Sequence, residues 1–172
     1  SGQSNATKAC NFTSTGIKNA TTRNLISDTI YYLGGHNSFS VYPNQIYEKE
    51  RGTTVYSGRP TEWTGKIALA YPSDYGYAAD LGKCSQNLNN YNNSTCTSNN
   101  WMKAIVAPNY GWLLTPRSGI ASNVWYVYSS GGVYYNSYVY NAYGVAPVLF
   151  LNSDANVKSG TGTSSDPYQI SV

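Results

Sequence analysis

Residues 123–140 read NVWYVYSSGGVYYNSYVY and carry the clearest structural pattern in the chain. The turn residues Ser129–Gly132 separate two runs rich in valine and aromatic residues, which predicts a β-hairpin with strands at Asn123–Tyr128 and Val133–Tyr140. Successive side chains point to opposite faces of a strand. Strict alternation in the second strand therefore places one set toward the core, namely Val133, Tyr135, Ser137 and Val139. It places the other set toward solvent, namely Tyr134, Asn136, Tyr138 and Tyr140.

The remaining chain mixes short apolar runs with glycine and proline. Three such runs predict buried strands: Lys66–Ala70, Trp112–Leu114 and Val145–Leu151. Apolar residues at three- and four-residue steps predict a helix over Gly16–Leu33, and Ser73 or Asp74 is expected to cap a short helix from Pro72 to Ala79. Few helices and many short strands predict an α+β fold. Because no linker interrupts residues 1–172, we expect a single domain.

The composition restricts the class of protein. The chain has 172 residues, enough to bury a hydrophobic core. Only 11% of the residues are charged, against about 25% in ordinary soluble domains. The net charge of +3 comes from scattered lysines and arginines, which argues against a nucleic-acid partner. Neutral polar residues supply the solubility instead, a composition typical of secreted and cell-surface proteins.

The sequence contains no recognisable membrane-span or signal-peptide pattern. No apolar stretch has the length of a membrane span, and no signal peptide opens the sequence. The opening Ser1-Gly2 resembles a cloning remnant, so we expect that an export signal or membrane anchor has been removed. The expected location is extracellular or at the cell surface, without direct membrane contact by this chain.

Two of the three cysteines bracket a polar loop. Cys84 and Cys96 enclose an asparagine-rich segment. A disulfide between them would close a loop of about 13 residues and contribute roughly 3 kcal/mol in the entropy model. The alternative is a pair of free thiols near the surface. With the disulfide, Cys10 would be left free or paired outside this chain, and an oxidising compartment would be favoured.

The sequence contains no pattern that predicts catalysis. His36 is the single histidine, and it has no companion at the spacing of metal ligands. Glycine loops for phosphate and nucleophile-elbow motifs are missing. We therefore expect a non-enzymatic protein without cofactor or metal. A glycan hydrolase stays as an alternative, which would need two carboxylates facing one cleft.

The tyrosines of the hairpin suggest binding. Tyrosine offers a large, rigid contact area and one directional hydroxyl, and antibody binding loops use Tyr, Ser, Gly and Asn for this reason. Aromatic residues also concentrate at binding hot spots. The alternative is that these tyrosines only reflect strand propensity and cross-strand packing.

Residues 111–151, GWLLTPRSGIASNVWYVYSSGGVYYNSYVYNAYGVAPVLFL, carry a family resemblance. They resemble the variable region of target proteins of diversity-generating retroelements, with its W-L-R/T-S/P, Y-V-N-S-x-G and G-V-R-P-V-L motifs. Ala146 stands where the last motif has arginine. TGKIALAYPSDYGYAA (64–79) and GTGTSSDPY (160–168) are similar to surface proteins of gut Firmicutes, some of which have a pilin-like N-terminal anchor.

The resemblance implies a C-type-lectin-like fold with a variable region at about residues 112–151. Mutagenesis at template adenines would diversify one exposed face, and the residues reachable by that route are Ile120, Ser122, Asn123, Tyr128, Ser130, Gly132, Tyr134, Tyr135, Asn136, Tyr138, Tyr140, Asn141 and Tyr143. All of these except Ser130 and Gly132 are expected to contact the ligand.

The predicted function is thus ligand binding by an extracellular display domain. The expected partner is a protein or glycan on another cell or a phage, bound without metal. The alternative is a structural subunit, such as a pilin head, or an adhesin of fixed specificity. The sequence leaves the oligomeric state open.

Overall fold

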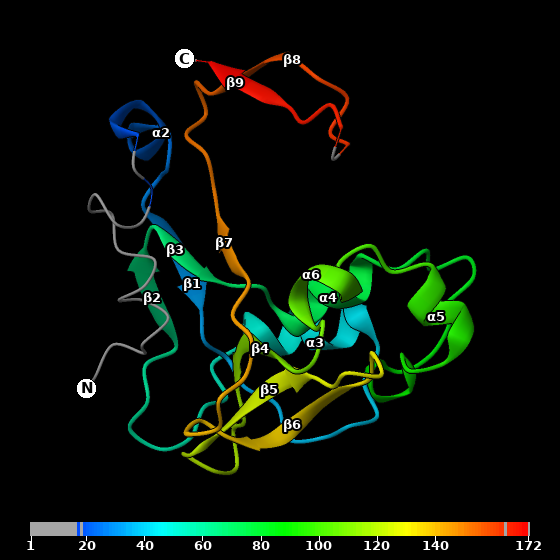
Figure 1. The fold of residues 1–172 in the computed structure, drawn as a ribbon. Helices are drawn as coiled ribbons and strands as arrows, with labels where there is room; N and C mark the ends of the chain where they lie inside the picture. The colour runs from blue at the N-terminus through cyan, green and yellow to red at the C-terminus, as the bar shows by residue number, and fades with distance from the viewer. Residues whose placement is uncertain (1–16, 18, 164, 172) are drawn as a thin grey trace. The chain divides into compact units, whose positions relative to one another are not determined.

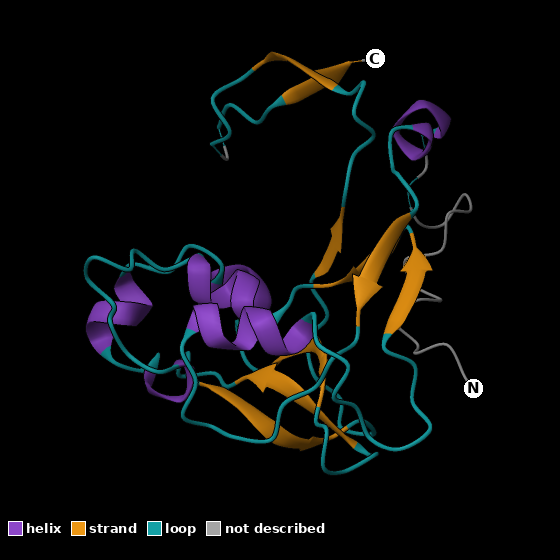
Figure 2. Cartoon of the chain, turned by 180° about the vertical axis from the view of Figure 1, so that it is seen from behind, coloured by secondary structure: helices purple, strands orange, loops and turns teal. Residues whose placement is uncertain are grey.

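The computed structural model describes residues 17, 19–163 and 165–171. The predicted α+β class is confirmed, because short helices and small antiparallel sheets alternate along these residues (Figures 1 and 2). Cys10 lies outside the described residues. The described residues form two compact units: the first contains residues 17, 19–29, 65–67, 149–163 and 165–171, and the second contains residues 30–64 and 68–148. The lectin-like fold and the single domain over residues 1–172 stay predictions.

The predicted helix over residues 16–33 is wrong in its second half. Helix α2 spans Ala20–Asn24, and the Asn19 side chain caps it by accepting the backbone N–H of Thr21 at 2.8 Å. Strand β1, Thr29–Tyr32, follows and pairs with β2, Glu62–Gly65. The sequence Thr-Ile-Tyr-Tyr is β-branched and aromatic, and such residues favour strands. Residues 29–32 therefore form a strand with a distant partner, although the spacing of their apolar residues is also compatible with a helix.

The first unit also contains the end of the chain. Strand β8, Asn156–Ser159, pairs antiparallel with β9, Gln169–Ser171. Before this hairpin, Ile26 and Leu151 form an isolated antiparallel bridge. Strands β3 at Ile67–Leu69 and β7 at Pro147–Leu149 form a two-stranded pair, and most of their residues belong to the second unit. The prediction that Val145–Leu151 is buried is wrong, since Phe150 is 52% exposed.

In the second unit, helices α3 (Pro43–Glu50) and α4 (Pro72–Tyr77) pack against each other. Both begin with proline, whose missing N–H is not needed in a first helical turn. The predicted capping residue of α4 is partly corrected: Tyr71 is the N-cap, and Asp74 accepts its backbone N–H at 2.9 Å.

A fully buried carboxyl group joins these two helices. Glu50, the last residue of α3, accepts the backbone N–H of Ser73 at 3.0 Å and also the Ser73 hydroxyl. The Arg51 guanidinium lies 3.3 Å from the same carboxyl. Burial raises the pKa of Glu50 to about 7, although the hydrogen bonds from Ser73 oppose this rise. The side chain thus connects the end of α3 to the beginning of α4.

A three-stranded antiparallel sheet covers the helices in the second unit. Its order is β4 (Gly111–Pro116), β5 (Asn123–Val127) and β6 (Val133–Tyr138), so the predicted hairpin is confirmed with shorter strands. One face of this sheet contacts α4 and the 3₁₀ helix η1 (Leu88–Asn90), and its side chains share a core with α3 and the short helices α5 (Ser94–Ser98) and α6 (Lys103–Val106). The core side chains include Ile46, Leu88, Val106, Leu113, Trp125, Val127 and Val133. The other face of the sheet carries the candidate site.

Candidate functional site

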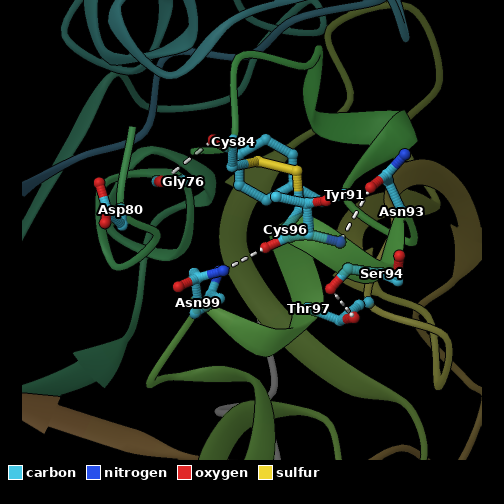
Figure 3. Close-up of a disulfide and its surroundings, with 12 residues drawn as sticks. Gly76, Asp80, Cys84, Tyr91, Asn93, Ser94, Cys96, Thr97 and Asn99 are labelled. Atoms are coloured by element: carbon cyan, nitrogen blue, oxygen red, sulfur yellow. Dashed lines mark hydrogen bonds between the residues drawn. A yellow bond between two sulfur atoms is a disulfide. The ribbon is translucent and has the colours of Figure 1, made fainter. Parts of the chain in front are cut away.

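The loop beside the hairpin is closed by a disulfide. Cys84 and Cys96 are bonded, as predicted, so the free-thiol alternative is excluded. Both lie in the core, with exposed fractions of 2% and 1%. Figure 3 shows the disulfide next to Tyr91, whose hydroxyl donates to the Gly76 carbonyl at 3.1 Å. The polar loop 84–96 is therefore anchored to the core from within.

The turn of the hairpin packs on this disulfide-closed loop. The Tyr134 hydroxyl donates to the Asn89 carbonyl at 3.2 Å, and the Tyr75 hydroxyl donates to the Gly131 carbonyl at 3.0 Å. Gly131 has φ 103°, in the left-handed region, where residues with a side chain are strained. A Cβ at Gly132 would lie 2.8 Å from the Asn89 carbonyl oxygen. The close approach of Gly132 to the Asn89 carbonyl therefore requires glycine at position 132. The resemblance, in contrast, implies that the codon for residue 132 varies.

Aromatic side chains cover the outer face of the sheet. We call this set the aromatic face; it consists of Tyr110, Trp112, Tyr126, Tyr128, Tyr134 and Tyr143. Strand register brings Trp112, Tyr126 and Tyr134 side by side, one from each strand. Tyr143 packs on them, with its ring centroid 4.5 Å from that of Trp112. Contacts of this kind contribute about 0.5–1.5 kcal/mol each beyond the area they bury, so the face is held rigidly.

Hydrogen bonds fix several hydroxyls of the aromatic face. The Tyr126 hydroxyl donates to Asn136 Oδ1 at 3.2 Å, and the Ser137 hydroxyl donates to that of Tyr143 at 3.0 Å. Burial, with smaller effects from neighbouring tyrosines, raises the pKa of Tyr126 to about 12. A hydrogen bond with Tyr128 is the main cause that raises the pKa of Tyr110. The hydroxyls of Tyr110 and Tyr126 are therefore neutral at physiological pH and can donate or accept hydrogen bonds.

A register shift divides into two groups the tyrosines that were predicted to share the solvent side of the second hairpin strand. Tyr134 pairs with Tyr126, whereas Ser137 pairs with Val124, so β6 carries one more residue than β5 between these pairs. An extra residue of this kind is a β-bulge, and a one-residue shift changes the face to which later side chains belong. Tyr138 and Tyr140 accordingly form a separate stacked pair with centroids 5.1 Å apart. The prediction that Tyr134, Asn136, Tyr138 and Tyr140 form one continuous surface is therefore corrected: Tyr138 and Tyr140 are separate from Tyr134.

A pocket of about 390 Å³ lies at one end of the aromatic face. Its lining residues are Asn92, Tyr126, Tyr128, Ser130, Tyr134 and Asn136. Asn92 comes from the disulfide-closed loop, and the others come from the hairpin. The disulfide therefore helps to position one side of the pocket, because it anchors the loop that carries Asn92.

The predicted site residues differ in where they lie. Ile120, Tyr128, Asn136, Tyr138 and Tyr140 are exposed, whereas Ser122, Tyr134, Asn141 and Tyr143 are half-buried. Asn123 and Tyr135 have exposed fractions of only 4% and 8%. Tyr135 stacks on Phe39 at 4.1 Å between ring centroids, on the core side of the sheet. Asn123 and Tyr135 are thus not part of an exposed surface, and their assignment to ligand contact is corrected.

The predicted ligand-contact residues missed four contributors to this surface. Tyr110, Trp112 and Tyr126 belong to the aromatic face, and Asn92 lines the pocket. The alternation that assigned Tyr134 could have found Tyr126, since Tyr126 and Tyr128 occupy alternate positions of the first hairpin strand. No local pattern could have found Asn92, because the packing of the disulfide-closed loop on the hairpin brings it there.

The side chains that could act as catalysts or metal ligands do not line the pocket. His36 is half-buried beside Trp125, with ring centroids 6.3 Å apart, and burial is the larger cause that lowers its pKa. Within the described ranges, no three His, Cys, Asp or Glu side chains are grouped to hold a metal ion. Among the same residues, no helix has the length and apolar character needed to cross a membrane.

No protein-family model, curated protein or solved structure matches the chain.

Proposed function

We propose that this chain is a non-enzymatic extracellular domain that binds a protein or glycan partner through the aromatic face and its pocket. The observation that carries the proposal is the contiguous packing of six aromatic side chains on the solvent side of a sheet whose other face is the core. Structural packing of a sheet needs one apolar face. A second, aromatic face that has a pocket at one end is a suitable surface for binding a partner.

The energetics of such a face favour binding. Its rings are held by mutual contacts and by hydroxyl hydrogen bonds, such as that between Tyr126 and Asn136. Little side-chain entropy is therefore lost when a partner binds, and preorganisation of this kind raises affinity. Tyr128 is 39% exposed at the edge of the pocket, which leaves a large part of its ring available for contact.

The resemblance to diversified variable regions agrees with this location. All residues that line the pocket except Asn92 and Tyr126 belong to the set implied to vary, namely Tyr128, Ser130, Tyr134 and Asn136. Diversification at these positions would change the ligand without changing the core. The disulfide supports an oxidising, extracellular compartment.

Binding to an array of purified extracellular proteins and glycans tests the proposal. Tyr128→Ala and Tyr134→Ala should each weaken binding to the recognised probe by about tenfold or more, as at other aromatic hot spots. Tyr56→Ala is the matched control, since Tyr56 is 40% exposed, lies in a turn, and belongs neither to the aromatic face nor to the pocket lining. The proposal is refuted if no probe is bound, or if all three variants bind as the parent chain does. Self-association of the chain at micromolar concentration, weakened by the same two substitutions, would favour the structural-subunit alternative.

A further inference from the structure

The pocket is lined by neutral side chains alone. Three tyrosines, two asparagines and one serine surround it. The sequence has no Asp, Glu, Lys or Arg between Arg117 and Asp154. A charged ligand group that leaves water needs a partner of opposite charge, because burial of an unpaired charge is unfavourable. The lining therefore favours a ligand without charge.

The aromatic walls of the pocket meet at a corner. The rings of Tyr128 and Tyr134 lie 6.1 Å apart between centroids at an interplanar angle of 81°. The Tyr126 ring continues the wall, with its centroid 6.1 Å from that of Tyr134. The face of an aromatic ring is electron-rich and attracts the positive edges of C–H groups. The corner thus suits a compact ligand that presents C–H groups on a flat side.

The polar groups of the pocket match hydroxyls. Asn136 Oδ1 accepts from the Tyr126 hydroxyl at 3.2 Å, which turns the amide so that its two N–H donors are directed elsewhere. Among the described residues, no acceptor is found for these donors. The Tyr134 hydroxyl donates to the Asn89 carbonyl, so its oxygen keeps the capacity to accept. A ligand hydroxyl can accept from an amide and donate to a tyrosine oxygen at once.

We propose that this pocket binds a neutral pyranose ring of a glycan; the inference rests on the proposed ligand-binding function and names its ligand class. A pyranose combines the two required features, because axial C–H groups form a flat side and hydroxyls surround its rim. The volume of about 390 Å³ is within the usual range of about 300–1,000 Å³ for small-molecule sites. A peptide that extends a sheet binds along a strand edge, whereas this pocket opens on the face of the sheet.

An array of neutral and acidic glycans covering the common hexopyranoses gives the first test, performed with the full chain. We expect binding to at least one neutral glycan, and no gain in binding from sulfate or carboxylate groups. The neutral glycan bound on the array is then titrated into isotope-labelled protein. The side-chain amide resonances of Asn92 and Asn136 should shift, since both amides line the pocket.

Variants locate the sugar in the pocket. Asn136→Asp keeps the shape of the side chain but removes both amide donors and adds a charge, so the affinity measured by calorimetry should fall about tenfold or more. Tyr128→Ala should have a similar effect, and Tyr56→Ala should have none. Circular dichroism and unfolding of each variant verify that it is folded.

Three results would overturn the inference. They are the lack of any neutral glycan bound on the array, preferential binding of acidic glycans, and unchanged sugar affinity in Asn136→Asp. If the chain binds no glycan but binds an arrayed protein, and Tyr128→Ala weakens that binding, the sugar ligand is refuted. The proposed function is not refuted by this result. A chain that binds neither class refutes both. Binding of tetramethylammonium by the parent chain, lost in Tyr128→Ala and without any sugar binding, would assign the pocket to cations instead.

Discussion

Replacement of the buried carboxyl, Glu50→Gln, should remove a large pH dependence of folding stability. Burial raises the pKa of Glu50 from its ordinary value of 4.5 to about 7. The folded protein therefore keeps the proton over a pH range in which the unfolded chain has lost it. Its contribution to stability is complete below about pH 4.5 and is lost as the pH rises to about 7. Each tenfold difference in proton affinity corresponds to about 1.4 kcal/mol, so the loss is roughly 3 kcal/mol.

The glutamine variant isolates this effect. Its amide can still accept the Ser73 N–H and can donate to the Ser73 hydroxyl, but it does not titrate. The free energy of unfolding is measured with urea by circular dichroism between about pH 4.5 and 8. The stability of the parent chain minus that of Glu50→Gln should decrease by roughly 3 kcal/mol across this range. Titrating groups shared by both proteins cancel in the difference.

Glu48→Gln provides the control, because Glu48 lies on the same helix and is exposed. The difference between the parent chain and this variant should change little with pH. A pH-independent difference for Glu50→Gln would refute the reasoning, since the carboxyl would then have the same proton affinity in the folded and unfolded chain.

Other outcomes follow from the loop, the turn and the variable positions. Replacing Cys84 and Cys96 with serine should lower the free energy of unfolding by about 3 kcal/mol, the loop-closure value for this separation, and a loss below about 1 kcal/mol in urea unfolding would contradict it. Gly131→Ala should destabilise the chain more than Gly58→Ala, because both glycines have positive φ but only a Cβ at position 131 meets another side chain, at 2.8 Å from Thr97 Cγ2; equal urea midpoints would refute this. Sequencing near the gene should reveal a near-copy of the variable region that differs at adenines, with changes at Tyr128 and other exposed positions and none at Gly132; the lack of such a copy and of a reverse transcriptase would favour the fixed adhesin or pilin head.

The hairpin and its alternation were predictable because both depend on neighbours in the sequence. The turn at Ser129–Gly132 lies between runs of strand-forming residues, and the core side chains Val133 and Tyr135 follow at two-residue spacing. The disulfide was predictable for a similar reason, since Cys84 and Cys96 enclose a loop with few apolar side chains of its own.

The prediction of a helix over residues 16–33 was wrong because the spacing of apolar residues contains no information about distant strands. The segment Thr29–Tyr32 meets strand β2 some thirty residues later, and hydrogen bonds to a paired strand stabilise it as β-structure. The buried position of Glu50 was invisible for the same reason. Only the approach of helix α4 encloses its carboxyl and supplies Ser73 as a donor.

The sequence by itself thus determined the α+β class and the hairpin, and it favoured a disulfide between Cys84 and Cys96 over free thiols. Tertiary structure alone decided which of the tyrosines act together. The β-bulge separates Tyr138 and Tyr140 from the aromatic face, and packing of the disulfide-closed loop brings Asn92 to the pocket. The physical reason is that periodicity and loop closure are local properties of the chain, whereas strand register and burial are set by contacts between residues far apart in sequence.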